Sequence, residues 1–285
     1  MSGNSSKLIA FNYFGGKFTF LDELYQYFPV DFTHLIDLFA GSFVVSLNYK
    51  GNVIKTANEI NEEVTNFFTV LRDRRPELVR ALQLTPCSEL EYKRCWDITN
   101  DPLERARRYF VRVRQSFYGM GAQRKNKGWH MAKSQINCTG GETVSKWNNA
   151  IPKLDEVALR IASNFQITAD DYAKCIDRID FIRAFFYCDP PYPLSCRKSQ
   201  KDYRFEFTDD DHIKLAKKLY KIKGLAMVSS YENELYDKLY GGKKGWTKIK
   251  LTPKMNNIRS SKVQEVIWFN YSLDRTRSGQ NSLFK

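Results

Sequence analysis

The sequence predicts an α/β protein with a doubly wound, mostly parallel sheet that is interrupted by an inserted helical subdomain. Strand and helix patterns alternate before about residue 72, strand signals vanish between about 72 and 160, and the alternation then resumes. A chain of 285 residues with 42% hydrophobic content can bury the core of such a domain. We expect a discontinuous α/β domain formed by 1–71 and 161–272, a helical insert at 72–160, and a polar, loosely held tail at 273–285.

The first part of the α/β pattern contains two strand and helix units. Apolar residues in 35–39 predict a strand, a small-residue turn follows at 41–42, and residues 44–50 predict a short helix. A second strand in 53–61 ends on polar and acidic residues. It is followed by a helical segment at 62–82, in which apolar and charged residues alternate at helical spacing.

The insert is predicted to be helical and basic. One face of the helix within residues 101–121 is apolar, and arginines occupy the remainder. The apolar positions are Ala106, Tyr109, Phe110, Val113 and Phe117, and the arginines are Arg105, Arg107, Arg108, Arg112 and Arg114. A loop at 118–131 is rich in Gly, Lys and Arg, and a helix at 154–164 ends the insert. These arginines suit either phosphate neutralisation or an ordinary solvated face.

After the insert, the strand and helix alternation resumes. Strands are predicted within 165–172, 183–192, 225–231, 247–251 and 263–271, and helices at 173–177, after Thr208 and within 232–240. Three aspartates, 209–211, suit the positive N-terminal end of the helix that follows Thr208.

The net charge indicates a polyanionic partner. The chain carries 45 Lys and Arg against 32 Asp and Glu, a formal charge of +13. Basic proteins gain affinity for nucleic acid by releasing counterions from phosphates, and an anionic membrane surface is the alternative. No apolar stretch approaches a membrane span and the first residues do not resemble a signal peptide, so we expect a cytoplasmic protein.

Cysteine and histidine usage predicts neither a disulfide framework nor a metal site. The six cysteines contain no C-x-x-C pair, and the three histidines are far apart in the sequence. We expect reduced, mostly structural thiols and no bound metal. Cys188, in a predicted buried strand, is expected to pack in the core.

Polar residues follow four of the predicted strands and can line one ligand pocket, because open α/β sheets bind ligands beyond the carboxyl ends of their strands. They are Gly41 and Ser42, Glu59 and Asn61, Asp171, and Asp189. An acid after the second strand can accept hydrogen bonds from ribose hydroxyls, which favours a nucleoside-containing cofactor. The sequence "FAGSFVV" is neither a phosphate-binding loop nor a dinucleotide fingerprint, so a nucleoside without pyrophosphate is preferred over ATP or NAD. Each residue taken alone can also be an ordinary loop residue.

The sequence "DPPY" at 189–192 predicts a clamp for an exocyclic base amine. Asp189 supplies a carboxylate acceptor, and the Pro190 carbonyl, held rigid by the two prolines, supplies a second acceptor. Tyr192 offers a ring on which a base taken out of its stack can rest. The alternative is a proline-stiffened loop at the edge of a sheet.

These motifs together resemble the Dam-like adenine-specific (N6) DNA methyltransferase family. The resemblance runs from about Phe11 to Asn270 in the family's order: "YFGGK", "DLFAGS", "NEIN", a basic insert, "ADDY" and "DPPY". It implies a sheet of the S-adenosylmethionine-dependent methyltransferase type, S-adenosyl-L-methionine as cofactor and double-stranded DNA as partner. It also implies transfer of a methyl group to the N6 of adenine in a specific sequence by base flipping and direct displacement, in a bacterial or phage-infected cell.

The resemblance also assigns roles to individual residues. The catalytic motif that holds the target adenine is Asp189, Pro190, Pro191 and Tyr192. The cofactor is expected among Tyr13, Gly15, Gly16, Lys17, Asp37, Phe39, Gly41, Ser42, Glu59, Asp171 and Tyr172, with Glu59 on the ribose and Asp171 near the adenine amine. DNA contacts are expected from Arg112, Tyr118, Arg124, Lys125 and Lys127. Phe43 stands where the family pattern Phe-x-Gly-x-Gly has its second glycine, so a glycine-only backbone conformation cannot be assumed there.

Alternatives remain open at this stage. The same fold and motif can serve cytosine N4 or another amine, and Phe43 is compatible with a catalytically impaired DNA-binding relative. A small-molecule methyltransferase would not need so basic an insert. The sequence does not reveal the recognised site, or whether a cognate restriction endonuclease exists; we expect a monomer.

Overall fold

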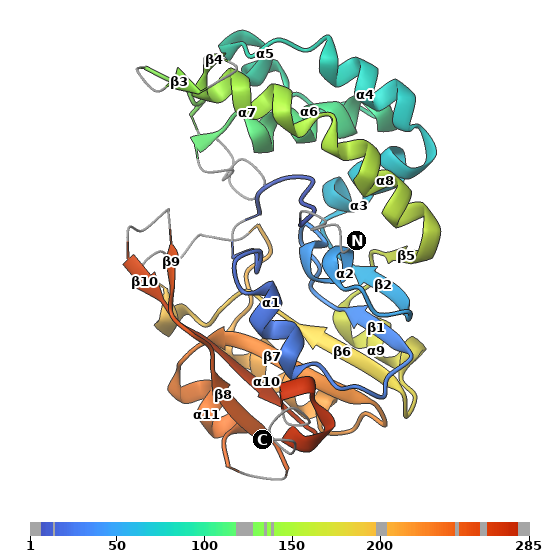
Figure 1. The fold of residues 1–285 in the computed structure, drawn as a ribbon, viewed down its shortest axis with the longest axis vertical. Helices are drawn as coiled ribbons and strands as arrows, with labels where there is room; N and C mark the ends of the chain where they lie inside the picture. The colour runs from blue at the N-terminus through green and yellow to red at the C-terminus, as the bar shows by residue number, and fades with distance from the viewer. Residues whose placement is uncertain are drawn as a thin grey trace, which may run out of the picture. The chain divides into compact units, whose positions relative to one another are not determined.

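The computed structural model describes residues 7–13, 15–117, 128–133, 136–137, 140–197, 204–242, 245–256 and 261–278. The chain divides into two compact units, which Figure 1 shows as ribbons. The helical unit comprises 1–16 and 61–167, and the sheet unit comprises 17–60 and 168–285.

The main sheet is mostly parallel: among its described pairings, only those of β11 (Glu265–Phe269) are antiparallel. Its strands within the sheet unit are β1 (His34–Asp37), β2 (Ile54–Asn58), β6 (Ala184–Cys188), β7 (Leu225–Tyr231), β8 (Thr247–Lys250) and β11. The sheet also includes β5 (Phe165–Thr168), of which residues 165–167 are assigned to the helical unit. Among the described residues the strand order is β5-β2-β1-β6-β7-β11-β8. β1 pairs in parallel with β2 and β6, β6 pairs in parallel with β7, and β11 is antiparallel to β7 and β8. A separate antiparallel ribbon is formed by β9 (Lys254–Asn256) and β10 (Ser261–Val263).

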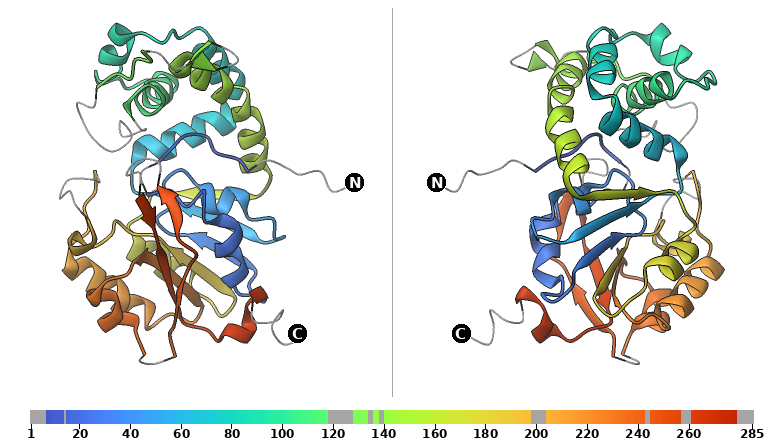
Figure 2. Two further views of the ribbon diagram at one scale, coloured as in Figure 1. Left: turned by 60° about the vertical axis from the view of Figure 1, so that its left-hand side comes forward. Right: turned by 90° about the vertical axis from the view of Figure 1, so that its right-hand side faces the viewer.

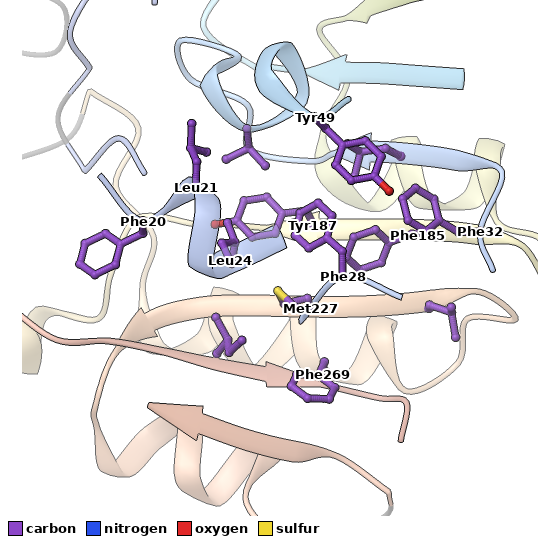
Figure 3. Close-up of a cluster of buried hydrophobic side chains, with 14 of the residues drawn as sticks. Phe20, Leu21, Leu24, Phe28, Phe32, Tyr49, Phe185, Tyr187, Met227 and Phe269 are labelled. Carbon is purple, nitrogen blue, oxygen red and sulfur yellow. The ribbon is translucent and has the colours of Figure 1, made fainter. Parts of the chain in front are cut away.

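Successive residues of the central strands belong alternately to two hydrophobic clusters, one on each face of this sheet. Figure 3 shows one cluster, in which Phe185, Tyr187, Met227 and Phe269 pack against Phe28 and its neighbours. It is covered by α1 (Leu21–Leu24), the short helix η1 (Tyr25–Tyr27) and α2 (Val44–Asn48). The intervening strand residues pack against α9 (Tyr172–Ile179), α10 (Asp209–Leu219) and α11 (Glu234–Tyr240) (Figure 2). Helices on both faces are the defining feature of a doubly wound fold.

Local signals in the sequence account for the helix ends of this unit. The Thr208 hydroxyl accepts from the Asp211 N–H while the Asp211 carboxylate accepts from the Thr208 N–H, which is a capping box at the start of α10. Asn233 caps α11 by accepting from the Tyr236 N–H at 2.8 Å. Two further short 3₁₀ helices are η3 (Leu194–Cys196) and η4 (Leu273–Arg275).

The helical unit packs its helices around aromatic side chains. Its helices are α3 (Glu62–Asp73), α4 (Arg75–Gln83), α5 (Glu89–Arg94), α6 (Pro102–Arg114), α7 (Glu142–Ala150) and α8 (Lys153–Asn164), and it also contains the two-residue strands β3 (Ile136–Asn137) and β4 (Gly140–Gly141). Phe67 of α3 stacks on Phe110 of α6 with ring centroids 5.5 Å apart, and Phe110 also contacts Trp147. Phe11 packs edge-on against Phe67.

The structure corrects several details of the helical segments. The expected helix at 62–82 is two helices, because Pro76 lies in the first turn of α4 and a proline inside a continuous helix would clash with the preceding turn. Phe117, expected on the apolar face, lies beyond the end of α6 and is 45% exposed, while Val111 is buried. The strands β3 and β4 lie where no strand was expected.

The observed division of the chain also differs from the expected boundaries. The first break falls at 60/61 rather than 71/72, because α3 packs against α6 and α8. The second falls at 167/168 rather than 160/161. The beginning of the expected loose tail is held: the Arg275 carbonyl accepts from the Val30 N–H at 2.9 Å, and Thr276 is fully buried.

No helix within the described part of the chain is both long and apolar enough to cross a membrane.

Candidate active site

Asp189 directly follows β6, at the carboxyl ends of the parallel strands. Its two carboxylate oxygens each accept from the Lys17 ammonium at 2.7 Å, and Oδ1 also accepts from the Ser229 hydroxyl at 3.0 Å. Ser229 lies on β7, and its hydroxyl donates its single hydrogen to Asp189. The Tyr187 hydroxyl, 2.9 Å from Ser229 Oγ, therefore donates to the Ser229 oxygen. Asp189 is therefore held by groups from two other segments of the sheet unit.

Lys17 lies at the centre of a buried chain of polar groups. Its side chain is 2% exposed, and its Nζ also donates to the Tyr192 hydroxyl at 2.6 Å. The Tyr192 hydroxyl in turn donates to Glu265 Oε2 at 2.6 Å, and that oxygen lies 3.8 Å from Lys17 Nζ. The cluster that we call the Asp189 cluster consists of Lys17, Asp189, Tyr192, Ser229 and Glu265.

The charges of this cluster shift one another's protonation equilibria. Burial favours the neutral amine of Lys17, but attraction by Asp189 and Glu265 outweighs it and raises the pKa of Lys17. Burial also raises the pKa of Glu265, with repulsion by Asp189 adding to it and the Lys17 charge opposing it.

The turn after β1 has a left-handed backbone at two positions. Gly41 has φ 52°, and Phe43 has φ 59° and ψ 16°. A glycine-like conformation could not be assumed at Phe43 from the sequence, but the chain adopts it. The Phe43 N–H donates to the Ala40 carbonyl at 2.7 Å, and the side chain is fully buried. Packing of the aromatic ring offsets the cost of this conformation, about 1 kcal/mol for a residue with a Cβ.

Two acidic residues flank this turn. Asp37, the last residue of β1, is 1% exposed and accepts from the N–H and hydroxyl of Ser46 at 3.2 and 2.9 Å. Burial raises the pKa of Asp37 to about 7, although the Ser46 hydrogen bonds oppose the shift. Glu59 follows β2, is 7% exposed, and accepts from the Gly41 N–H at 2.8 Å through Oε2. The Glu59 carboxylate is thereby fixed on the turn after the neighbouring strand.

Asp171 and Tyr172 begin α9 beside a group of aromatic rings. Asp171 caps the helix by accepting from the Ala173 N–H at 2.9 Å. The ring centroid of Tyr172 lies 5.8 Å from that of Phe39 and 5.6 Å from that of Phe207, and the Phe39 and Phe207 centroids are 5.6 Å apart. The structure thus brings together Phe39 and Tyr172, which the sequence singled out, and adds Phe207.

Three of the expected cofactor residues belong to the helical unit, and a fourth, Lys17, has contacts that were not expected. Tyr13, Gly15 and Gly16 belong to the helical unit, where the Gly16 N–H donates to the Tyr13 carbonyl and Gly15 has φ 80°. Lys17, expected near the cofactor, binds the Asp189 carboxylate. A contact between Lys17 and the cofactor stays a prediction.

The remaining members of the "DPPY" motif are largely enclosed. Pro190 is buried, and Tyr192 is 4% exposed with its ring edge-on to Tyr231 at 4.8 Å. The stacking role of Tyr192 stays a prediction, and so does the acceptor role of the Pro190 carbonyl. Ser42, in the turn after β1, is 3% exposed.

Sequence reasoning missed Ser229, Glu265 and Phe207. Ser229 and Glu265 lie within predicted strands. The strand pattern predicts which face of the sheet a residue is on, but it does not predict a contact with Asp189. Phe207 had one weak signal, an aromatic residue directly before a helix cap.

The expected DNA-binding residues are only partly described. Arg112 donates to Glu63 Oε2 at 2.6 Å and to the Cys95 carbonyl at 2.7 Å, and its guanidinium lies 5.3 Å from the Trp96 ring centroid. Arg105 also binds Glu63, at 2.8 Å. A DNA contact by Arg112 stays a prediction; the described contacts are within the helical unit. Tyr118, Arg124, Lys125 and Lys127 lie outside the described residues.

The described cysteines, Cys87, Cys95, Cys175, Cys188 and Cys196, are free thiols, and Cys188 is fully buried as expected. Within the described segments, no group of three or more His, Cys, Asp or Glu side chains is arranged to hold a metal ion.

The fold and the strand-end residues define an α/β protein of the methyltransferase type, with a mostly parallel sheet flanked by helices. A sequence model of the D12 class N6 adenine-specific DNA methyltransferases matches residues 13–256. The chain belongs to this family, whose members methylate adenine N6 in DNA, and the predicted family and fold class are confirmed. Membership implies a methyl donor and a DNA substrate.

Two relatives are similar in sequence. The chain is 24% identical over 272 residues to the DNA adenine methylase of Haemophilus influenzae, covering 89% of this chain and 90% of that protein. It is 32% identical over 161 residues to the type II methyltransferase M.MjaIII of Methanocaldococcus jannaschii, covering 51% of this chain and 55% of that protein. The match therefore spans little more than half the length of the archaeal relative.

Proposed function

We propose that this protein transfers a methyl group from S-adenosylmethionine to the exocyclic N6 of an adenine in a specific duplex DNA sequence. The observation that carries the proposal is the setting of Asp189. Its side chain is 16% exposed, whereas those of Lys17 and Glu265 are 2% and 6% exposed. Asp189 is therefore the charged member of the Asp189 cluster that a ligand can reach.

The chemistry of adenine N6 requires acceptors rather than a strong base. The amine is a poor nucleophile because its lone pair is delocalised into the ring, and acceptors for both hydrogens localise that pair. In the proposed complex Asp189 and the Pro190 carbonyl accept these hydrogens. Lys17 and Ser229 orient the carboxylate before the base arrives, so positioning supplies much of the rate. The target adenine must leave the duplex to reach this carboxylate.

The residues around the turn after β1 suit the proposed cofactor. Glu59, held on the Gly41 N–H at 2.8 Å, places a carboxylate where ribose hydroxyls can donate to it. Phe39, Tyr172 and Phe207 offer aromatic faces for an adenine ring, and Asp171 offers a carboxylate for its amine. When bound, S-adenosylmethionine supplies an electrophilic methyl group on a sulfonium.

The proposal extends to the setting in which the enzyme works. We infer a monomer that binds double-stranded DNA through its basic charge in the cytoplasm of a bacterial or phage-infected cell. A cognate restriction endonuclease is one partner that such an enzyme can have.

The decisive experiment is nucleoside mass spectrometry of duplex DNA after incubation with the protein and isotopically labelled S-adenosylmethionine. We expect labelled N6-methyladenine. Labelled N4-methylcytosine would show that the methylated amine is cytosine N4 and not adenine N6. DNA binding without any methylation would indicate a catalytically impaired relative.

The Asp189→Ala variant tests the site itself. It should lower the rate by roughly 10³-fold or more while leaving cofactor affinity within about twofold. The matched control is Asp177→Asn, because Asp177 is 69% exposed on α9 and its ion pair within the described residues is with Lys218, outside the Asp189 cluster. Full activity in Asp189→Ala would overturn the assignment.

A further inference from the structure

Glu265 belongs to the Asp189 cluster although it comes from β11, the last described strand of the sheet along the chain. β11 runs antiparallel to β7, and Glu265 at its first position pairs with Tyr231 at the last position of β7. The beginning of β11 therefore lies at the same sheet edge as the carboxyl ends of the parallel strands. The Glu265 side chain is 6% exposed and that of Asp189 is 16% exposed, so Glu265 is the more deeply buried of the two carboxylates.

The hydrogen bonds from Lys17 to Glu265 have a single possible direction. A lysine ammonium only donates and an ionised carboxylate only accepts. The Tyr192 hydroxyl between them must then donate to Glu265 at 2.6 Å and accept from Lys17 at 2.6 Å. Glu265 thus fixes the direction of the Tyr192 hydroxyl, and that hydroxyl fixes one of the three hydrogens of Lys17.

Lys17 connects these hydrogen bonds to Asp189, the proposed acceptor of the target amine. Lys17 directs its other donors to the two oxygens of Asp189, both at 2.7 Å, so the orientation of the Asp189 carboxylate depends on where Lys17 is held. Glu265 has no hydrogen bond to Asp189 among the described contacts. Besides the direct repulsion between the two carboxylates, Glu265 therefore acts on Asp189 through Lys17, which it reaches through the Tyr192 hydroxyl and by an ion pair at 3.8 Å.

Stability alone does not account for this arrangement. Replacing buried ion pairs with apolar side chains is often neutral or stabilising, because the cost of desolvating the charges rivals their attraction. Here a buried cation and a buried carboxylate lie beside the partly exposed carboxylate of Asp189, and the two carboxylates repel each other. Such an arrangement is explained if it positions a reacting group.

We propose that Glu265 is a positioning residue for methyl transfer, which acts through the Tyr192 hydroxyl and Lys17 to orient the Asp189 carboxylate toward the target amine. This inference rests on the proposed function, since it assumes that Asp189 receives the amine. Glu265 itself contacts neither the base nor the cofactor in this scheme.

The test compares Glu265→Gln with the unaltered full-length protein in single-turnover methylation of duplex DNA. Glutamine keeps the size and one acceptor oxygen but loses the charge. The rate should fall on the order of 10- to 100-fold, as expected for a displaced reacting group, while cofactor and DNA affinities stay within about twofold. Glu232→Gln is the matched control, because Glu232 is 47% exposed and pairs with Lys248 and Lys250.

A pH profile separates positioning from simple structural damage. The groups that face Lys17 are Asp189, Tyr192, Glu265 and Tyr231, and the attraction of Glu265 helps to raise the pKa of Lys17. Without that charge, Lys17 should lose its proton at lower pH. The alkaline decline of the single-turnover rate should therefore begin at lower pH in Glu265→Gln than in the unaltered protein. An unchanged alkaline limb and an unchanged rate would overturn the inference.

Tyr192→Phe provides a second, independent test, because it removes only the hydroxyl that links Glu265 to Lys17. Its rate loss should resemble that of Glu265→Gln, and the double variant should be no slower than the slower single variant, since both changes break one chain. If Glu265→Gln does not fold, an unchanged rate in Tyr192→Phe still refutes the inference. If the unaltered protein produces no N6-methyladenine, the proposed function fails instead, which is a distinguishable result.

Discussion

The raised pKa of Asp37 predicts that Asp37→Asn stabilises the protein increasingly as the pH rises. Asp37 is 1% exposed, and burial raises the pKa of its carboxyl from the ordinary value of 3.8 to about 7. A carboxyl whose pKa is higher in the folded state favours folding while it is protonated. That contribution is fully present below the unfolded pKa and is lost as the pH rises through about 7. Asparagine has no such titration.

The size of the effect follows from the shift. A change from 3.8 to about 7 is close to three pKa units, which corresponds to about 4 kcal/mol at 1.36 kcal/mol per unit. Roughly 3 kcal/mol of this falls between about pH 4.5 and pH 8. Because Ser46 donates both its N–H and its hydroxyl to one oxygen of Asp37, the amide oxygen of asparagine can keep those two hydrogen bonds.

Urea denaturation of both proteins at several pH values between 4.5 and 8 measures this effect. Other titrating groups cancel in the difference between variant and parent, so the difference in unfolding free energy should grow with pH in favour of Asp37→Asn. A difference that stays constant with pH would show that Asp37 titrates as it does in the unfolded chain, and would refute the reasoning.

Three further predictions concern stability and are checked by chemical denaturation. Phe43→Gly should be more stable than Phe43→Ala by about 1 kcal/mol, because the position has φ 59°, while both lose about 2–5 kcal/mol relative to the parent through loss of the buried ring; the reverse order would contradict the left-handed conformation. Gly224→Ala should cost about 1–3 kcal/mol, since its Cβ would lie 2.7 Å from a backbone oxygen, whereas Gly141→Ala, with nothing within 4 Å, should be nearly neutral; equal effects would count against the packing argument. Glu63→Gln should cost about 1–3 kcal/mol, because it removes the charge that pairs two partly buried arginines; an unchanged midpoint would show that those pairs contribute little.

Local signals in the sequence were sufficient for the main elements of the sheet unit. Apolar runs predicted β1, β6 and β7, and the acidic cluster after Thr208 predicted the start of α10. These predictions succeeded because strand alternation, turn chemistry and helix capping act between residues close in sequence. The single helix predicted at 62–82 was wrong for a local reason as well. The prediction followed the helical periodicity and gave too little weight to Pro76, in whose neighbourhood the chain starts a new helix.

The sequence by itself determined which residues follow the parallel strands, and it thereby predicts where the chemistry lies. Residues that follow parallel strands share one sheet edge whatever the rest of the chain does, so Glu59 and Asp189 could be singled out from strand ends alone. The αL backbone at Phe43 could not be found in this way, because it is imposed on a bulky residue by the packing around it.

Only the tertiary structure decided what holds Asp189. Its partners Lys17 and Ser229 are separated from it by 172 and 40 residues, and Glu265 reaches the site because β11 enters the sheet antiparallel to β7. No local pattern encodes contacts at such separations, since they depend on strand order and direction. The motif "DPPY" predicts the group that meets the substrate, and the assembled sheet determines how that group is held.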